Sequence, residues 1–417
     1  MTEIAPPGRR AAVAFIFVTL MLDVLSMGVV IPVLPKLIES LTPGVEADAV
    51  RIGGLLGLVW AVMQFLVTPI QGALSDRFGR RPVLLLSMTG LGLDYILMAL
   101  APTLAWLFVA RAISGATAAS FGTANAYIAD ITPPDKRAAA FGLMGAAFGI
   151  GFIIGPALGG LAGSFDPHLP FWVSAGLCLI NALYGYFVLP ESLPPERRAK
   201  KFSLANAHVL GSLRLLASNT QLAGLATAHF FYSVAHNVYP AVFVWFTMYR
   251  YGWGETTNGL ALAASGAAGI IVQGLLVGPV VKHLGARRAM VVGLLFGISG
   301  FLIYGIGPVS ISVWIAIAVS ALWGFYTPAA QSIMTQTVSP TEQGRLQGAL
   351  GSLMGLAAII SPPLYTNVLA SAIEAKDAYP DLPIMGAPFF LAAFLLMCAL
   401  AAATIATRPH TEAKAVP

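Results

Sequence analysis

GALSDRFGRRP, residues 72–82, is a short charged segment between two long apolar runs. Gly72 and Gly79 favour a tight turn and close backbone approach. The charged side chains are Asp76, Arg77, Arg80 and Arg81. The pattern predicts a hinge that joins two apolar helices.

The composition predicts an integral membrane protein. Of 417 residues, 57% are hydrophobic and only 10% are charged, whereas soluble domains carry about 25% charged residues. Apolar runs of about 20 residues recur, and a backbone without water must bond to itself, so these runs are expected to be helices. The chain is therefore predicted to be an all-α membrane protein with twelve transmembrane helices. They lie near residues 11–34, 52–74, 83–101, 103–128, 139–163, 171–190, 219–248, 258–281, 289–307, 311–336, 346–370 and 386–406.

The basic residues predict an orientation. Most of the 23 Lys and Arg residues fall in segments that share one side if the N-terminus is cytoplasmic. The exceptions on the other side are Lys36, Arg51, Arg250 and Lys376. Both termini are thus expected in the cytoplasm, and the formal charge of +5 reflects topology, so no nucleic-acid partner is expected.

An internal repeat divides the spans into two sets of six. At a constant offset of 206 residues, Gly79 falls on Gly285 and Pro156 on Pro362. Other matches are Gly72 with Gly278, Arg81 with Arg287, Pro134 with Pro340, Gly142 with Gly348, Gly145 with Gly351 and Gly149 with Gly355. We predict an N-terminal half (1–190), a cytoplasmic central loop (191–218) and a C-terminal half (219–417), with a substrate site between parallel halves.

Here the chain resembles the major facilitator superfamily. GALSDRFGRRP is similar to its loop motif G-x-L-x-D-R-x-G-R-R, and GPVVKHLGARR (278–288) is similar to a degenerate second copy. The resemblance covers the whole chain and implies the major facilitator fold. It gives the loop between spans two and three a gating role through Gly72, Asp76, Arg77, Gly79, Arg80 and Arg81. Asp76 is expected near Arg345.

A second motif resembles the antiporter branch of this superfamily. GIGFIIGPALGG, residues 149–160, contains G-x-x-x-G-P-x-x-G-G in the fifth span. The resemblance implies an antiporter hinge at Gly151, Gly155, Pro156 and Gly159. Tight packing of any helix bundle would also use small residues here, so both interpretations stay open.

The resemblance is densest to the tetracycline efflux proteins. It rests on LDVLSMGVVIPVLP (22–35), MQFLVTPIQGALSDRFGRRPVLL (63–85), LDYILMALAP (93–102) and FGLMGAAFGIGFIIGP (141–156). In that family the residues matching Asp23, Gln64, Asp94 and Arg111 are functional. The second half departs from it, because Gly269 and Gly297 stand where those exporters carry His and Asp.

Three charged residues lie inside predicted spans, where charges are costly and usually functional. Asp23, Asp94 and Arg111 are expected to couple transport to protons. Burial and a nearby cation shift the pKa of a carboxyl group in opposite directions, so such a group can gain and lose a proton near neutral pH. A structural ion pair of Arg111 with either Asp is the other interpretation.

Polar and aromatic residues of the spans are candidates to line the substrate site. They are Gln64, Tyr127, His229, His236, Asn237, Tyr239, Gln273 and Gln331. His229 lies 206 residues after Asp23, at the symmetry-related position. No metal-ligand spacing is present, so no metal site is expected.

We expect a secondary active transporter, a proton-coupled antiporter that exports a small amphipathic, tetracycline-like molecule by alternating access. A symporter or facilitator for another metabolite is the alternative. No catalytic set or nucleotide motif is visible, so an enzyme is not expected, nor is any cofactor beyond the proton gradient. We expect the protein in the inner membrane, as a monomer. Its expected partners are the small-molecule substrate, protons and the lipid bilayer.

Overall fold

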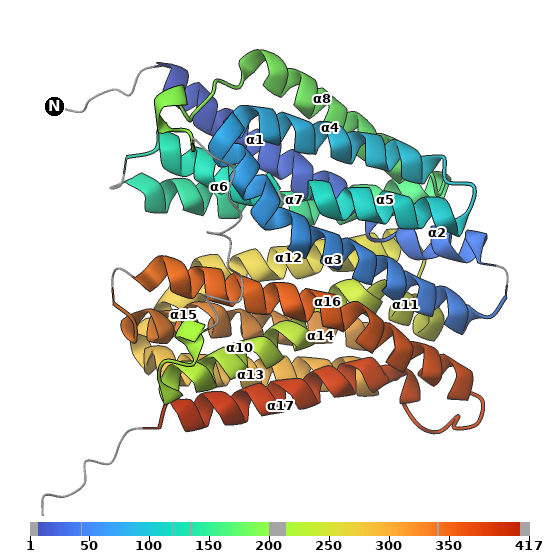
Figure 1. Cartoon of the computed structure of the whole chain (residues 1–417). Coiled ribbons are helices and arrows are strands. Elements are labelled where there is room, and N and C mark those ends of the chain that lie inside the picture. Colours follow the sequence, from blue (N-terminus) through green and yellow to red (C-terminus); the bar gives the residue numbers. More distant parts are fainter. Residues whose placement is uncertain are drawn as a thin grey trace, which may run out of the picture. The chain divides into compact units, whose positions relative to one another are not determined.

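The computed structural model describes residues 7–42, 44–118, 120–133, 136–199, 214–339 and 342–408. These residues form helices and no strands, as the apolar runs predict (Figure 1). Helices of the first half are α1 (Pro7–Val30), α2 (Leu34–Leu41), α3 (Glu46–Phe78), α4 (Arg80–Ala99), α5 (Leu104–Thr117), α6 (Ser120–Ile131), α7 (Arg137–Phe165) and α8 (Leu169–Val188). A short 3₁₀ helix, η2 (Pro195–Arg197), follows.

The second half begins with α10 (Thr220–His236) and α11 (Val238–Tyr251). The remaining elements are α12 (Glu255–Ile271), the π-helix η3 (Val272–Leu276), α13 (Val277–Ile306), α14 (Ile311–Ala321), η4 (Leu322–Phe325), α15 (Tyr326–Gln336), α16 (Gln343–Ala375), η6 (Ile384–Gly386) and α17 (Ala387–Ala406).

Nine helical stretches within the described residues are long and apolar enough to cross a membrane, and α1 with α2 forms a tenth, bent one. One of the nine, Glu255–Ile306, has 52 residues and contains two predicted spans. The predicted span 219–248 is divided between α10 and α11, neither of which reaches 18 residues. Each predicted span therefore corresponds to helix, and the all-α membrane fold is confirmed.

The repeat is visible in the backbone. Gly79 ends α3 with φ 108° and ψ 159°, and Gly285 breaks α13 with φ 77° and ψ 157°. A side chain disfavours positive φ, which explains why both copies of the loop carry glycine. Pro156 and Pro362 likewise both lie inside long helices, α7 and α16. Pro134 and Pro340 lie outside the described residues.

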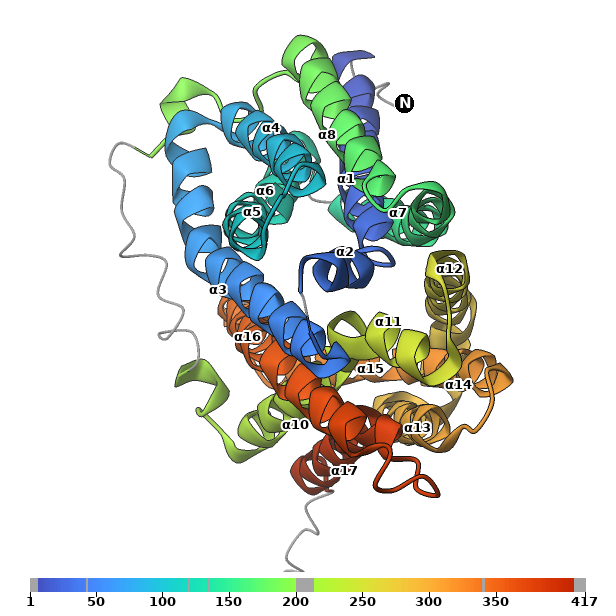
Figure 2. The ribbon, with the colours of Figure 1, turned by 90° about the vertical axis from the view of Figure 1, so that its right-hand side faces the viewer.

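Contacts divide the chain into two compact units. Among the described residues, unit 1 contains 7–199 together with Pro240–Ala267 and Pro362–Pro380, and unit 2 contains 214–239, Ala268–Ser361 and 381–408. In unit 1, α1 packs on α7 and α8, and α4 packs on α5 and α8 (Figure 2). In unit 2, α13 packs on α14, η4, α15 and α17, and α17 packs on α10.

Glycines on α7 permit unusually close contact with α1. A Cβ atom at Gly151 would lie 2.7 Å from the carbonyl oxygen of Met21, and one at Gly155 would lie 2.6 Å from that of Leu25. A Cβ at Gly159 would overlap the backbone of Val29. The predicted hinge residues are thus, in this structure, the surface on which α1 packs.

Substituting Gly159 by Ala is expected to lower the free energy of unfolding by about 1–3 kcal/mol, because α1 must move away from α7. Gly145→Ala on the same helix is the control, since no atom lies within 4 Å of its Cβ position. Thermal unfolding of the purified protein would measure both. Equal unfolding temperatures for the two variants would contradict this account.

Candidate functional site

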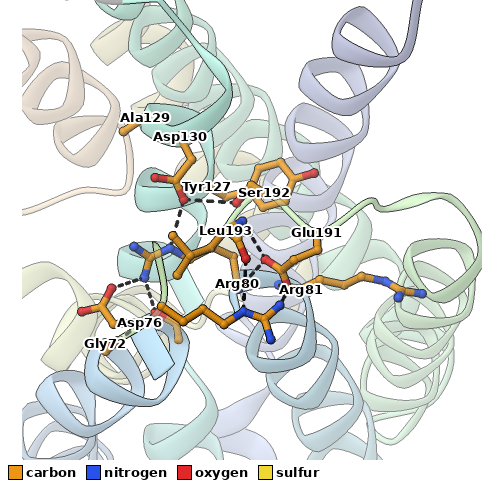
Figure 3. A network of polar contacts seen from close by, with 12 residues as sticks. Gly72, Asp76, Arg80, Arg81, Tyr127, Ala129, Asp130, Glu191, Ser192 and Leu193 are labelled. Atoms are coloured by element: carbon orange, nitrogen blue, oxygen red, sulfur yellow. Dashed lines mark hydrogen bonds and ion pairs between the residues drawn. The ribbon is translucent and has the colours of Figure 1, made fainter. Parts of the chain in front are cut away.

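In the segment 72–82, residues 72–78 form the last turns of α3, Gly79 makes the turn, and residues 80–82 begin α4. The predicted turn is thus confined to Gly79, and Gly72 lies within α3. A polar network surrounds this junction, which we call the α3–α4 turn (Figure 3). Arg80 is its centre: Nη1 contacts Asp76 Oδ1 at 2.5 Å and Ser75 Oγ at 2.7 Å, and Nε contacts Asp130 Oδ2 at 3.2 Å. Three acceptors thus converge on one guanidinium, whose fork of donors suits this arrangement.

Glu191, just after α8, holds the first turn of α4. Its carboxylate accepts hydrogen bonds from the backbone N–H groups of Arg80 at 2.8 Å, Arg81 at 3.3 Å and Leu193 at 3.0 Å. A carboxylate at a helix N-terminus satisfies free donors and interacts favourably with the helix dipole. A Cβ at Gly79 would overlap this carboxylate. The loop motif therefore needs glycine here for a second reason besides its positive φ.

The central segment also contacts this turn. The N–H of Ala199 donates to the carbonyl of Asp76 at 2.9 Å, and Ser192 Oγ donates to Asp130 at 3.2 Å. Of the other motif residues, Arg77 lies over the Phe78 ring at 5.2 Å, and Arg81 donates to the carbonyl of Tyr186 at 2.5 Å. Gly72 has no atom within 4 Å of its Cβ position.

Asp76 pairs with Arg80, four residues on, and Arg345 pairs with Glu342 at 3.6 Å. Asp76 belongs to unit 1 and Arg345 to unit 2. Their contact therefore stays a prediction.

Removal of the Glu191 carboxylate should destabilise the turn, since two N–H groups of α4 lose their partner. Glu191→Ala is expected to lower the free energy of unfolding by about 1–3 kcal/mol. Glu196→Ala, on the exposed η2 helix, is the matched control. Chemical unfolding in detergent would compare them, and an unchanged Glu191→Ala midpoint would refute the capping role.

The three charged residues of the predicted spans lie in one polar region of unit 1. Asp23 on α1 is 6% exposed and Asp94 on α4 is 1% exposed, while Arg111 on α5 is half-buried. Arg111 interacts electrostatically with Asp94. Cys178 on α8 interacts with both carboxyl groups, so Asp23 and Asp94 share one environment.

Polar side chains between α1 and α8 extend this region. Ser174 donates to the carbonyl of Ser26 at 3.0 Å, and the Cys178 thiol lies 3.3 Å from Ser26 Oγ. One or two turns away, Thr19 donates to Asn181 at 3.2 Å. Buried polar groups usually need such partners. Sequence analysis missed these residues, although Ser, Thr and Asn inside apolar runs are the signal that could have shown them.

The predicted substrate residues of the first half have different surroundings. Gln64 is half-buried on α3. Tyr127 is fully buried in a hydrophobic cluster with Ile16, Leu84 and Ile128, and its hydroxyl donates to the carbonyl of Pro190 at 2.9 Å. Its role in substrate binding stays a prediction.

The predicted histidines belong to a cluster of aromatic rings in unit 2. Tyr232 is central, with its ring centroid 4.2 Å from that of Tyr326, 4.8 Å from Trp323, 5.8 Å from His229 and 6.2 Å from His236. Tyr239 lies 6.1 Å from His236 and continues the cluster toward Phe301 and Tyr304. We call His229, Tyr232, His236, Tyr239, Trp323 and Tyr326 the ring cluster.

Three members of the ring cluster bury polar groups without a partner. His229, Trp323 and Tyr326 are 3%, 4% and 0% exposed. Both His229 nitrogens, Trp323 Nε1 and the Tyr326 hydroxyl have no hydrogen-bond partner among the described residues. Such groups call for an explanation, because buried donors are nearly always satisfied.

The other predicted residues of the second half lie around this cluster or apart from it. Asn237 donates from Nδ2 to the carbonyl of Ser233 at 2.7 Å. Gln273 is exposed within the π-helix η3, and Gln331 is half-buried on α15. A Cβ at Gly297 would lie 3.0 Å from Trp323, whereas Gly269 has open space. Glycine at 297 therefore makes room for the indole.

Ion pairs gather at the N-terminal end of α3, about 37 Å along the helix from Asp76. Arg51 forms a two-pronged pair with Glu374 at 2.7 and 2.9 Å, and Lys376 lies 3.1 Å from Glu46. Lys36 pairs with Glu255 at 2.6 Å. Three of the four cations predicted on the outer side therefore form ion pairs between the first and second halves of the sequence. The second-half residues of these pairs all belong to unit 1.

Comparison with known proteins agrees with this architecture. The model of the Major Facilitator Superfamily matches residues 16–362 and 225–417. The chain belongs to this superfamily of membrane transporters, and it is not an enzyme.

Individual relatives cover almost the whole chain. It is 37% identical to the class C tetracycline resistance protein of Escherichia coli, over 91% of this chain and 94% of that protein. It is 36% identical to the class G tetracycline resistance protein of Vibrio anguillarum, over 89% of this chain and 93% of that protein. Human major facilitator superfamily domain-containing protein 10 is 28% identical over 93% of each chain.

Solved structures show the same fold. The crystal structure of the human organic anion transporter MFSD10 (TETRAN) matches with a TM-score of 0.70 and 25% identity, over 95% of this chain and all of that one. The nucleoside transporter NupG matches with a TM-score of 0.77 and 14% identity, over 97% and 100%, which shows the fold alone.

Proposed function

We propose that this chain is a proton-coupled antiporter that exports a planar, tetracycline-like aromatic molecule across the inner membrane. The observation that carries the proposal is the pair of buried carboxyl groups, Asp23 and Asp94, in one polar region with Arg111. Charges inside a membrane protein are rarely kept without a function. The names of the relatives at 36–37% identity, tetracycline resistance proteins, support the choice of substrate.

Proton binding at such a pair can drive transport. A carboxyl group enclosed by protein is stabilised as the neutral acid by burial and as the anion by a nearby arginine. Small changes in its surroundings between two carrier conformations can therefore change its protonation. The gradient supplies about 2.3 kcal/mol per charge per 100 mV.

The ring cluster is our candidate for the substrate side. Stacked rings favour a planar aromatic molecule, and the unpaired groups of His229, Trp323 and Tyr326 favour one that carries hydrogen-bonding oxygens. Because transport requires a change of conformation, we expect the rings to separate when substrate enters. The proposed orientation has both termini in the cytoplasm, and we propose a monomer as the working unit.

A second candidate is a carrier of aromatic anions. The ring cluster contains no Asp or Glu that would favour a cation. At position 297, where the tetracycline exporters carry Asp, this chain has a glycine against which Trp323 packs. The relative described as an organic anion transporter supports this alternative. The two candidates differ in the charge of the substrate and share the proton site.

Transport by reconstituted liposomes with a lumenal pH dye would test the proposal. We expect uptake of tetracycline, with or without Mg²⁺, to move protons in the opposite direction. Uptake of fluorescein alone would favour the anion carrier. Asp23→Asn should reduce proton-coupled uptake at least about tenfold, because its site can no longer exchange a proton.

Asp381→Asn, an exposed carboxylate, is the control for that variant. Wild-type coupling in Asp23→Asn would refute the coupling role. Uptake that runs equally well without any gradient would refute the antiporter.

The ion pairs at the N-terminal end of α3 are proposed to stabilise the conformation in which that end is closed. Each exposed pair contributes only about 0–1 kcal/mol, so several pairs together give an equilibrium that transport can reverse. Glu374→Arg places a second cation beside Arg51 and should favour opening.

Spin labels at the exposed positions 45 and 379 would report this opening as a longer distance. The double variant Arg51→Glu with Glu374→Arg should restore the shorter distance, because the pair is re-formed with its charges exchanged. A single variant with wild-type distances would contradict the role of this pair.

A further inference from the structure

Arg111 has an aromatic neighbour besides its acidic one. Its Cζ atom lies 5.6 Å from the centroid of the Trp60 ring on α3. This distance is within the range of a cation–π interaction, in which the negative face of an indole attracts a cation. The guanidinium of Arg111 therefore has two sources of negative potential, the Trp60 ring and the Asp94 carboxyl group.

In this structure the arginine is in contact with the ring and not with the acid. Arg111 and Asp94 attract each other, but they form none of the ion pairs within 4.0 Å found among the described residues. The Asp94 carboxyl group is 1% exposed, and the Ser114 hydroxyl is the hydrogen-bonding side chain that acts on it. Among the described residues neither Asp94 oxygen has a partner in well-formed hydrogen-bond geometry. An ionised carboxylate buried in this way would be very costly. The arrangement fits the protonated acid.

A glycine on α5 permits close approach to the backbone of Trp60 on α3. Gly115 lies one helical turn after Arg111, and a Cβ there would overlap the carbonyl oxygen of Trp60 and lie 2.9 Å from Met63 Cβ. Helix α5 therefore packs closely on α3 at Trp60. This close packing brings α5 and α3 together at Trp60, one helical turn along α5 from Arg111.

We propose that Trp60 is a positioning residue for proton coupling: its ring holds the Arg111 guanidinium while Asp94 carries the proton, and the guanidinium turns to the carboxylate when the proton leaves. The inference rests on the proposed proton coupling. One proton from solvent adds to one Asp94 oxygen, so the pair changes from neutral to a single positive charge. The ring face partly compensates that charge, which would otherwise be buried alone.

The other groups near this site are few. Tyr95 lies on the same helix as Asp94 and interacts electrostatically with Arg111. Cys178 on α8 interacts electrostatically with Asp94 and with Asp23 on α1. On α3 the neighbouring side chains Met63 and Gln64 do not titrate. Loss of the ring should therefore act mainly on the proton of Asp94.

Infrared titration of the purified protein tests this without any substrate. The carbonyl stretch of a protonated carboxyl group reports Asp94 as pH is varied, and Asp94→Asn identifies its contribution. In Trp60→Leu the ring no longer stabilises the charged Arg111 that accompanies protonated Asp94. We therefore expect the midpoint of the Asp94 titration to move by about half to one pH unit toward acid. Trp60→Phe keeps a weaker ring face and should shift the midpoint less.

Trp106→Leu on the exposed face of α5 is the matched control and should leave the midpoint unchanged. Thermal unfolding of each variant establishes that it is folded, and Trp60→Phe preserves most of the volume if Trp60→Leu is unstable. A wild-type midpoint in both Trp60 variants would overturn the inference. So would equal shifts in Phe and Leu, because the ring face would then not matter.

The outcome separates this inference from the proposed function. Unshifted midpoints together with proton-coupled uptake in liposomes would refute the role of Trp60 and leave the antiporter intact. Uptake without proton movement would refute the antiporter even if the midpoint of Asp94 shifts as expected. An infrared spectrum in which Asp94→Asn removes no titrating band would overturn the inference directly.

Discussion

The close contact between α1 and α7 is the constraint on which much of unit 1 depends. Glycines at 151, 155 and 159 let the two backbones approach to distances that any side chain would prevent. Within a membrane, where lipid is as apolar as Leu, such packing contacts are a main source of helix association. The contact fixes α1, and α1 carries Asp23. The same helix α7 packs at Gly160 on Gly259 of α12 with another face.

Buried charge is the second constraint, and it explains why the polar residues of the spans are grouped. Water cannot solvate a carboxyl group in this environment, so the protein supplies neighbours from α1, α4, α5 and α8. Asp94 and Arg111 are near but not in contact, while Trp60 and Ser114 complete their surroundings. A pair that were permanently joined would be structural. A pair in which the arginine has a second partner, the Trp60 ring, fits the proton coupling that we propose.

The two ends of α3 carry two different polar systems. At its C-terminal end the contacts of Arg80 and Glu191 connect α3, α4, α6 and the segment after α8, all within the first half (Figure 3). At its N-terminal end the pairs of Arg51 and of Glu46 reach second-half residues Glu374 and Lys376. The charges in the loop motif therefore order one half internally, while the opposite end joins the halves by exposed pairs that are individually weak.

The helical membrane fold, the duplicated loop and the few charged residues inside spans could all be predicted from the amino-acid sequence. These follow from apolar length, from glycine at positive φ in Gly79 and Gly285, and from the cost of charge in lipid. Other features became visible only in the folded chain. Glu191 caps α4, and Tyr127 donates to the carbonyl of Pro190 and lies in the core. Arg111 lies beside the Trp60 ring, and His229 joins a ring cluster with Trp323 and Tyr326. The physical reason is that these contacts join residues far apart in the chain. Local periodicity sets which face of a helix a residue occupies, whereas helix packing sets which residue it meets.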